Sequence, residues 1–193
     1  MKILLSTLNA KYIHSSLALR YLRSYARPTF PDIELVEYTI NDVTLNIVAD
    51  VYKRQPDVAA FSCYIWNIRE TLDVIRNLKK VRPDLPVVLG GPEVTYDADE
   101  WLKKHPEIDV IVIGEGEQTF LELLQVYDES RRTGEPPRLR DVAGIAYREG
   151  EHVRFTAPRA QIENLDTIPS PYADNLDELN NRVVYFEASR GCP

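Results

Sequence analysis

The chain has 193 residues, 44% of them hydrophobic and 27% charged, so it is long enough for one α/β core with a smaller appended part. Its formal charge of -7 argues against nucleic-acid binding, which selects for clustered lysine and arginine. Its longest apolar runs are too short to span a bilayer and it has no secretory segment, so we expect a cytoplasmic protein.

Strand and helix patterns alternate along the first two thirds of the chain. Short apolar runs bounded by turn residues predict strands at residues 2–7, 33–38, 57–63, 86–89 and 109–113. Apolar residues at helical spacing predict helices at residues 17–25, 43–52, 68–81 and 98–104, and another helix that starts after Gly116. Five strands that alternate with helices predict an α/β fold, a Rossmann-like (flavodoxin-like) parallel sheet with helices on both faces.

The segment from Asp109 to Leu124 is the most informative part of this pattern. Its run of β-branched residues, Val110–Ile113, predicts a strand buried on both faces, as in a parallel sheet. Gly114 and Gly116 permit a tight turn before the helix begins. A ligand at the carboxyl ends of the strands would meet this turn and the helix N-terminus.

The last third of the chain has a different character. Residues 128–137 are polar and contain two prolines, which predicts a connector, and Glu149-Gly150 predicts the turn of a β-hairpin. Residues 162–172 are expected to be an extended linker, and residues 183–188 one more strand close to the end of the sequence, which suggests truncation. We therefore expect an α/β domain at 1–128, a connector with the hairpin at 129–182 and the start of a further domain at 183–193.

The candidate binding residues come from the loops after four strands, because open α/β sheets bind ligands beyond the carboxyl ends of their strands. These loops are rich in glycines, hydroxyls, amides and aromatic rings and poor in lysine and arginine, so their ligand should have a broad apolar face. The candidates are Asn9, Tyr12, His14, Ser15, Ser62, Tyr64, Trp66, Asn67, Gly90, Gly91, Pro92, Glu93, Gly114, Glu115, Gly116, Glu117 and Thr119.

Three of these segments, residues 11–22, 90–95 and 114–120, resemble the N-terminal cobalamin-binding domain of cobalamin-dependent radical S-adenosylmethionine (SAM) proteins. Residues 188–193 resemble the start of the radical SAM domain, ending at the first cysteine of a C-x-x-x-C-x-x-C motif. The resemblance implies that 1–128 binds cobalamin and that 183–193 begin a truncated radical SAM domain. The full-length protein would then hold S-adenosylmethionine and a 4Fe-4S cluster, with Cys192 as a cluster ligand.

The resemblance also implies a function, although it assigns no catalytic residue to this chain. The full-length protein would be a methyltransferase, or a related enzyme that forms or rearranges C-C or C-P bonds. Its partner would be its own radical SAM domain, and its substrate an unknown small molecule or macromolecule. The alternatives are a flavodoxin-like docking or regulatory domain that no longer binds cobalamin and, third, a nucleotide-binding Rossmann domain. The third lacks support because no G-x-G-x-x-G follows the first strand.

Individual candidates have simpler explanations beside the functional one. The glycine pairs could admit the nucleotide tail of cobalamin or merely make tight turns. Ser62 and Thr119 could donate hydrogen bonds to that tail, and Tyr64 and Trp66 could pack on the corrin. Glu115 and Glu117 could act as acid and base, but acidic residues in a first helical turn also stabilise the helix. On that second interpretation Glu117 is the cap and Glu115 contacts corrin amides.

His14 and Cys63 are the remaining residues with distinctive chemistry. In cobalamin-dependent mutases and methionine synthases a D-x-H-x-x-G loop supplies a histidine to cobalt, but here Tyr12 and Leu17 replace its Asp and Gly. A ligating histidine normally needs such an orienting partner. We therefore favour loop or solvent hydrogen bonding for His14 over cobalt ligation. Cys63, at the end of a buried strand, is expected to be a small core residue.

Overall fold

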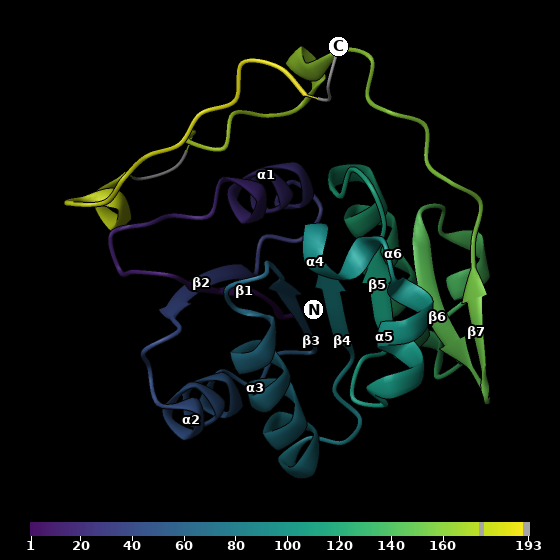
Figure 1. Ribbon diagram of the computed structural model, residues 1–193. Helices are drawn as coiled ribbons and strands as arrows, with labels where there is room; N and C mark the ends of the chain where they lie inside the picture. Colours follow the sequence, from purple (N-terminus) through teal and green to yellow (C-terminus); the bar gives the residue numbers. More distant parts are fainter. Residues whose placement is uncertain (174–175, 191–193) are drawn as a thin grey trace.

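The computed structural model describes residues 1–173 and 176–190, and in these residues one seven-stranded sheet lies between two layers of helices (Figure 1). Its order is β2-β1-β3-β4-β5-β6-β7, with the first five strands parallel and the last two antiparallel. The predicted flavodoxin-like fold is confirmed, and the predicted hairpin extends the same sheet. The strands are β1 (Ile3–Asn9), β2 (Ile33–Thr39), β3 (Val58–Ser62), β4 (Val87–Gly90), β5 (Val110–Val112), β6 (Ile145–Glu149) and β7 (His152–Phe155).

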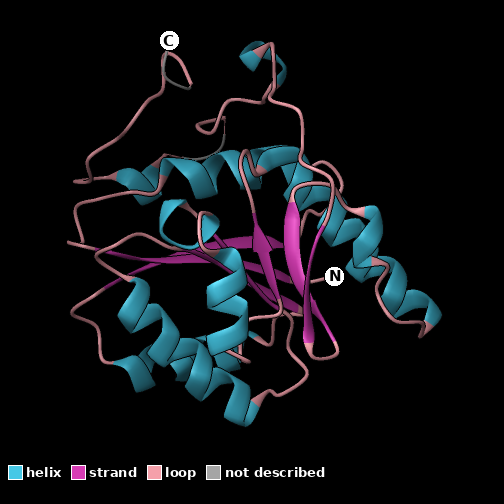
Figure 2. Cartoon of the chain, turned by 45° about the vertical axis from the view of Figure 1, so that its right-hand side comes forward, coloured by secondary structure: helices cyan, strands magenta, loops and turns pink. Residues whose placement is uncertain are grey.

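Helices cover both faces of the sheet, and Figure 2 shows the strands lying between the two helical layers. One apolar core holds Ile47, Ile75 and Leu102 from α2, α3 and α5, and the other holds Leu19 and Phe120 from α1 and α6. Short 3-10 turns lie at Leu139–Asp141, Leu165–Thr167 and Asp177–Leu179. The helices are α1 (Leu17–Ala26), α2 (Thr44–Arg54), α3 (Ile68–Val81), α4 (Pro92–Thr95), α5 (Ala98–Lys104) and α6 (Glu117–Thr133).

The central strands are apolar because both of their faces are covered. Every residue of β1 and β5 is buried, and so is every residue of β3. Continuous apolar runs are the pattern that such strands require. Across residues 1–173 and 176–190, none of the helices combines the length and apolarity that a membrane crossing would need.

Helix α6 continues past the residue at which the sequence pattern predicts a connector. The helix runs to Thr133 and ends at Gly134, which has φ 77° and so adopts the left-handed conformation that commonly closes a helix. Its last turns are polar but are stabilised by pairs such as Arg132 with Asp128, four residues apart at 3.1 Å. Polar composition there marks an exposed helix end rather than a loop.

The predicted strand at 183–188 is wrong. Its one ladder contact is an isolated bridge between Val183 and His14, and the side chains of Val183, Val184, Tyr185 and Phe186 are exposed. An apolar extended segment forms a strand when its backbone pairs with a neighbour. Beyond that single bridge, no strand among the described residues pairs with this segment.

Candidate functional site

The carboxyl ends of β3, β4 and β5 open into a cavity of about 940 Å³. Its other walls come from α1, the start of α6, residues 155–161 and the chain end at 187–190. Figure 1 shows the last of these segments as part of the yellow C-terminal stretch that passes over α1. The cavity therefore lies where ligands of open α/β sheets bind.

Part of the predicted binding set lines this cavity, and part of it lies elsewhere. Loops after three neighbouring parallel strands supply the lining members, because those strands end at the same edge. The lining residues are Ser62, Tyr64, Gly90, Gly91, Pro92, Gly114, Glu115, Gly116 and Glu117. The predicted residues outside the lining are Asn9, Tyr12, His14, Ser15, Trp66, Asn67, Glu93 and Thr119.

The floor of the cavity is apolar. Leu22 from α1 and Phe120 from α6 face Ala60, Val88 and Val112 from the sheet. These residues lie at helix and strand positions, so the sequence pattern identifies them only as core. A ligand that fills this space would need an apolar face or an apolar ring.

Two aromatic rings form a platform at the rim. The rings of Tyr64 and Trp66 are stacked, with centroids 4.5 Å apart and planes 5° from parallel. Trp66 remains 48% exposed although Tyr64 faces the cavity. Exposed, ordered aromatic surface of this kind favours a flat partner.

The four glycines in the predicted binding set differ in whether the backbone requires a glycine at that position. A Cβ on Gly91 would lie 2.4 Å from the backbone oxygen of Cys63, so the close approach of two loops requires this glycine. Gly114 has φ +79° with open space around it, so the turn requires it. Gly90 and Gly116 have no such backbone requirement, and a Cβ there would meet Val112 at 3.7 Å and Leu22 at 3.1 Å.

Asn67, Thr119 and Ser15 hold the framework together. The buried Asn67 donates from Nδ2 to the backbone oxygens of Leu8 and Ser62, and accepts from the Tyr64 N–H. Thr119, also buried, accepts from Arg159 at 2.6 Å, and Ser15 donates to the Val183 oxygen. Their hydrogen bonds thus connect loops that surround the cavity.

His14 contacts the C-terminal segment. Its Nδ1 lies 2.6 Å from the hydroxyl of Tyr185, and its backbone oxygen accepts from Asn9. His14 thus makes hydrogen bonds to β1 and to the C-terminal segment. Tyr185, 171 positions further along the chain, is a partner that the local sequence could not indicate.

Glu115 and Glu117 face a cation that sequence reasoning missed. Arg190 Nη2 donates to Glu117 Oε1 at 2.5 Å, and its Nη1 lies 3.7 Å from Glu115 Oε1. The guanidinium carbon also lies 5.1 Å from the centre of the Tyr21 ring. Glu115 accepts a further hydrogen bond from the backbone N–H of Ile162. The two carboxylates thus bind segments beyond α6.

Cys63 is a buried free cysteine, and burial raises the pKa of its thiol, with a smaller contribution from the Glu93 carboxylate. The thiol is therefore protonated and unreactive at neutral pH, as expected of a core residue. Cys192, the predicted cluster ligand, lies outside the described residues. Within the part of the chain that the structure describes, no group of three or more His, Cys, Asp or Glu side chains is arranged to hold a metal ion.

Comparison with known proteins identifies relatives of this chain. An uncharacterized methyltransferase of Pyrococcus horikoshii is 32% identical over 183 residues, which cover 92% of this chain and 38% of that protein. The cobalamin-dependent radical SAM methyltransferase TokK of Streptomyces tokunonensis is 33% identical over 150 residues, covering 72% of this chain and 21% of TokK. This chain thus spans well under half the length of either relative.

A solved structure and a family model agree with these relatives. The apo structure of the cobalamin-dependent S-adenosylmethionine radical enzyme OxsB superposes with a TM-score of 0.75, covering all of this chain and 27% of OxsB at 20% identity, which supports the shared fold. The B12 binding domain model matches residues 3–124, more than half of the chain. The chain therefore belongs to the B12 binding domain family and is related to cobalamin-dependent radical SAM methyltransferases.

Proposed function

We propose that the chain binds cobalamin in the cavity at the carboxyl ends of β3, β4 and β5, with the corrin at the rim. The observation that supports this most directly is the cavity itself, about 940 Å³ in volume and located where a parallel sheet offers loops from several strands. Membership of the B12 binding domain family supplies the identity of the ligand.

The residues around the cavity fit this cofactor. Cobalamin combines a broad, largely apolar corrin with amide groups at its edge and a nucleotide tail. The apolar floor suits an aromatic ring of the nucleotide tail inserted into the cavity, and the Tyr64 and Trp66 platform suits the flat corrin at the rim. Gly90, Gly114 and Gly116 line the cavity without side chains, and Ser62 and Glu115 offer polar groups to the tail and the amides.

Cobalamin would bring the reactive cobalt, and the domain would bind and orient it. His14 lies outside the cavity lining and is hydrogen-bonded to Tyr185, so we propose that it does not ligate cobalt. The rest of the activity belongs to a longer protein, because this chain spans 38% of its Pyrococcus relative and 21% of TokK. For that protein we propose a radical SAM methyltransferase, or a related enzyme that forms or rearranges bonds, with Cys192 as a ligand of its 4Fe-4S cluster.

The test is direct binding of hydroxocobalamin by the chain. After gel filtration we expect corrin absorbance to co-elute with the protein. Gly116→Leu should weaken binding roughly tenfold or more, because the new side chain extends into the cavity next to Leu22. Ala49→Leu, on the exposed face of α2, is the matched control and should bind as the unaltered chain does.

The competing hypothesis, a docking or regulatory domain without cofactor, makes the opposite prediction. Such a domain would elute colourless at all hydroxocobalamin concentrations. If the chain and its Gly116→Leu variant bound cobalamin equally well, the chain would still be a cobalamin-binding protein, but its binding site would not be this cavity.

A further inference from the structure

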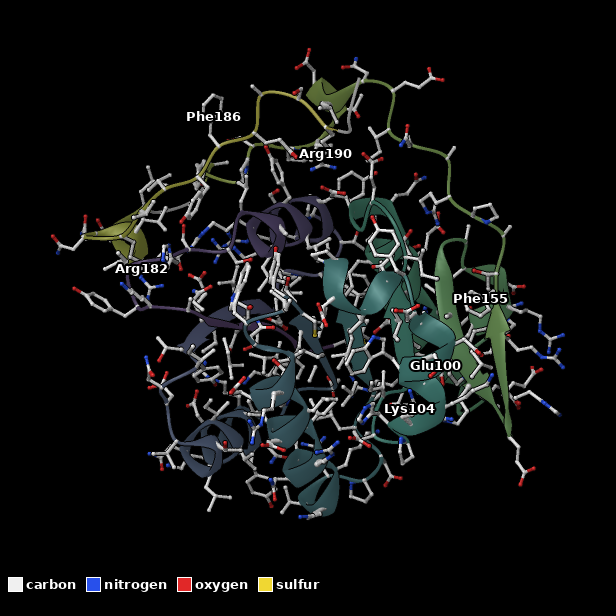
Figure 3. All side chains as sticks on the ribbon, in the orientation of Figure 1. Glu100, Lys104, Phe155, Arg182, Phe186 and Arg190 are labelled. Atoms are coloured by element: carbon white, nitrogen blue, oxygen red, sulfur yellow. The ribbon has the colours of Figure 1, made fainter. Side chains whose placement is uncertain are left out.

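Residues 176–190, called the strap below, form part of the wall of the proposed cofactor cavity. Glu187, Ser189 and Arg190 line the cavity opposite the sheet. Figure 3 shows Arg190 between the strap and the tops of α1 and α6, whereas Phe186 lies on the outer side. A ligand as broad as a corrin therefore meets the strap when it approaches the floor.

The strap is held by charges, by hydrogen bonds and by the buried side chain of Leu179. Glu178 pairs with Arg20 and Arg23, each at 2.7 Å, and Arg182 pairs with Glu37 at 3.2 Å. The apolar side chain of Phe186 is 82% exposed, so burial contributes little there. On the strap side of these pairs Glu178 and Arg182 are 39% and 27% exposed, so solvent and salt reach the pairs and weaken them, and the strap can lift without unfolding the sheet.

Arg190 is the contact that closes the strap over the cavity. It donates to Glu117 at 2.5 Å and to Glu187 at 2.7 Å, and packs on the ring of Tyr21. The Glu117 side chain is only 5% exposed, and among the described residues Arg190 is its one ion-pair partner. If the strap lifted and nothing took the place of Arg190, this buried carboxylate would be left unpaired, which is unfavourable.

We propose that Arg190 is a latch that competes with the cofactor for Glu115 and Glu117. This inference rests on the proposed cobalamin function. The guanidinium donates to these carboxylates when the strap is closed, and amide N–H groups at the corrin edge take its place when the cofactor binds. Only chains with a raised strap accept the cofactor, so the measured affinity is the intrinsic affinity multiplied by that fraction.

The first experiment follows the strap without any cofactor. Trypsin cleavage after Arg182, whose side chain is 27% exposed and paired with the buried Glu37, requires this part of the strap to leave the domain, so the rate of that cut reports opening. We expect Arg190→Ala to be cleaved roughly fivefold faster, and added NaCl to accelerate cleavage of the unaltered chain more than that of the variant. Arg190→Lys keeps the charge and should lie between them. Arg138→Ala, which removes an exposed pair with Glu129, is the matched control.

The second experiment measures hydroxocobalamin affinity for the same proteins. Arg190→Ala should bind roughly fivefold more tightly than the unaltered chain, in step with its faster cleavage, since the raised fraction sets the measured affinity. Weaker binding by Arg190→Ala would make Arg190 a cofactor contact and overturn the latch, and so would unchanged cleavage. Equal binding by both proteins also overturns it while leaving the proposed function intact. Absence of binding in both overturns the proposed function and the competition together.

Discussion

At the scale of single residues, glycines that look equivalent in the sequence differ in what requires them. Gly91 has φ +104°, and a Cβ there would collide with the Cys63 backbone. Gly114 shares a positive φ but has open space, and Gly90 has neither constraint. Gly91 is therefore required by packing between the loops after β3 and β4, so it needs no ligand to explain it.

These differences predict a graded series of alanine substitutions. Gly91→Ala should reduce the free energy of unfolding by about 3 kcal/mol, because strain and collision add. Gly114→Ala should cost about 1 kcal/mol, since only the left-handed conformation is penalised. Gly90→Ala should be close to neutral, and urea unfolding measures all three. Equal losses at Gly91 and Gly114 would contradict the assigned collision.

At the scale of elements, a buried ion pair fastens α1 to β2. The Arg20 and Glu37 side chains are 2% and 4% exposed, and Nη2 of Arg20 lies 2.9 Å from Oε2 of Glu37. Glu37 also accepts from the Ser16 N–H at the start of α1 and from Arg182 of the strap. One carboxylate therefore positions a helix, the loop before it and the strap.

Removing that carboxylate should be costly. Glu37→Ala is expected to lower the free energy of unfolding by about 3 kcal/mol, because among the described residues it leaves the buried Arg20 with Glu178 as its one remaining ion-pair partner. Glu34→Ala on the same strand removes a carboxylate that is 39% exposed and should cost at most about 1 kcal/mol. Urea unfolding of both variants gives the comparison, and similar losses would show that burial of the pair is unimportant.

At the scale of the whole molecule, the C-terminal hairpin completes the sheet and one of its two cores. β6 pairs with β5, and Val142, Ile145 and Tyr147 are buried in the core that contains α1 and α6. β5 itself has only three residues, so it gains much of its pairing from β6. The hairpin thus shares the core of the parallel strands, although the chain reaches it through a polar segment.

Truncation tests how far the α/β unit depends on that hairpin, and with it the boundary predicted at residue 128. A chain of residues 1–134 keeps all of α6 but exposes the edge of β5, and should unfold at lower urea concentration and aggregate. A chain of residues 1–173 keeps the hairpin, lacks the strap and should remain monodisperse. Light scattering and urea unfolding distinguish them. Equal midpoints for the two chains would favour an independent domain at 1–128.

Local patterns predicted most of the fold because they depend on neighbours a few residues away. The predicted helices at 68–81 and 98–104 match α3 and α5, and the glycine turn after β5 lies where the sequence indicates it. The same logic failed at residues 183–188, since β-propensity is satisfied only by a partner strand. The same reasoning predicted the end of α6 too early, because composition alone does not reveal a capped, exposed helix end.

The sequence by itself determined the parallel α/β sheet, the loops that meet at its carboxyl edge and the family resemblance, because periodicity, turn residues and short motifs are local. Only the tertiary structure decided which of those loops line one cavity, and that Arg190 and Glu117 meet there, 73 positions apart. Contacts over such distances depend on how helices and strands pack in space. They leave no periodic pattern in the chain from which they could be predicted.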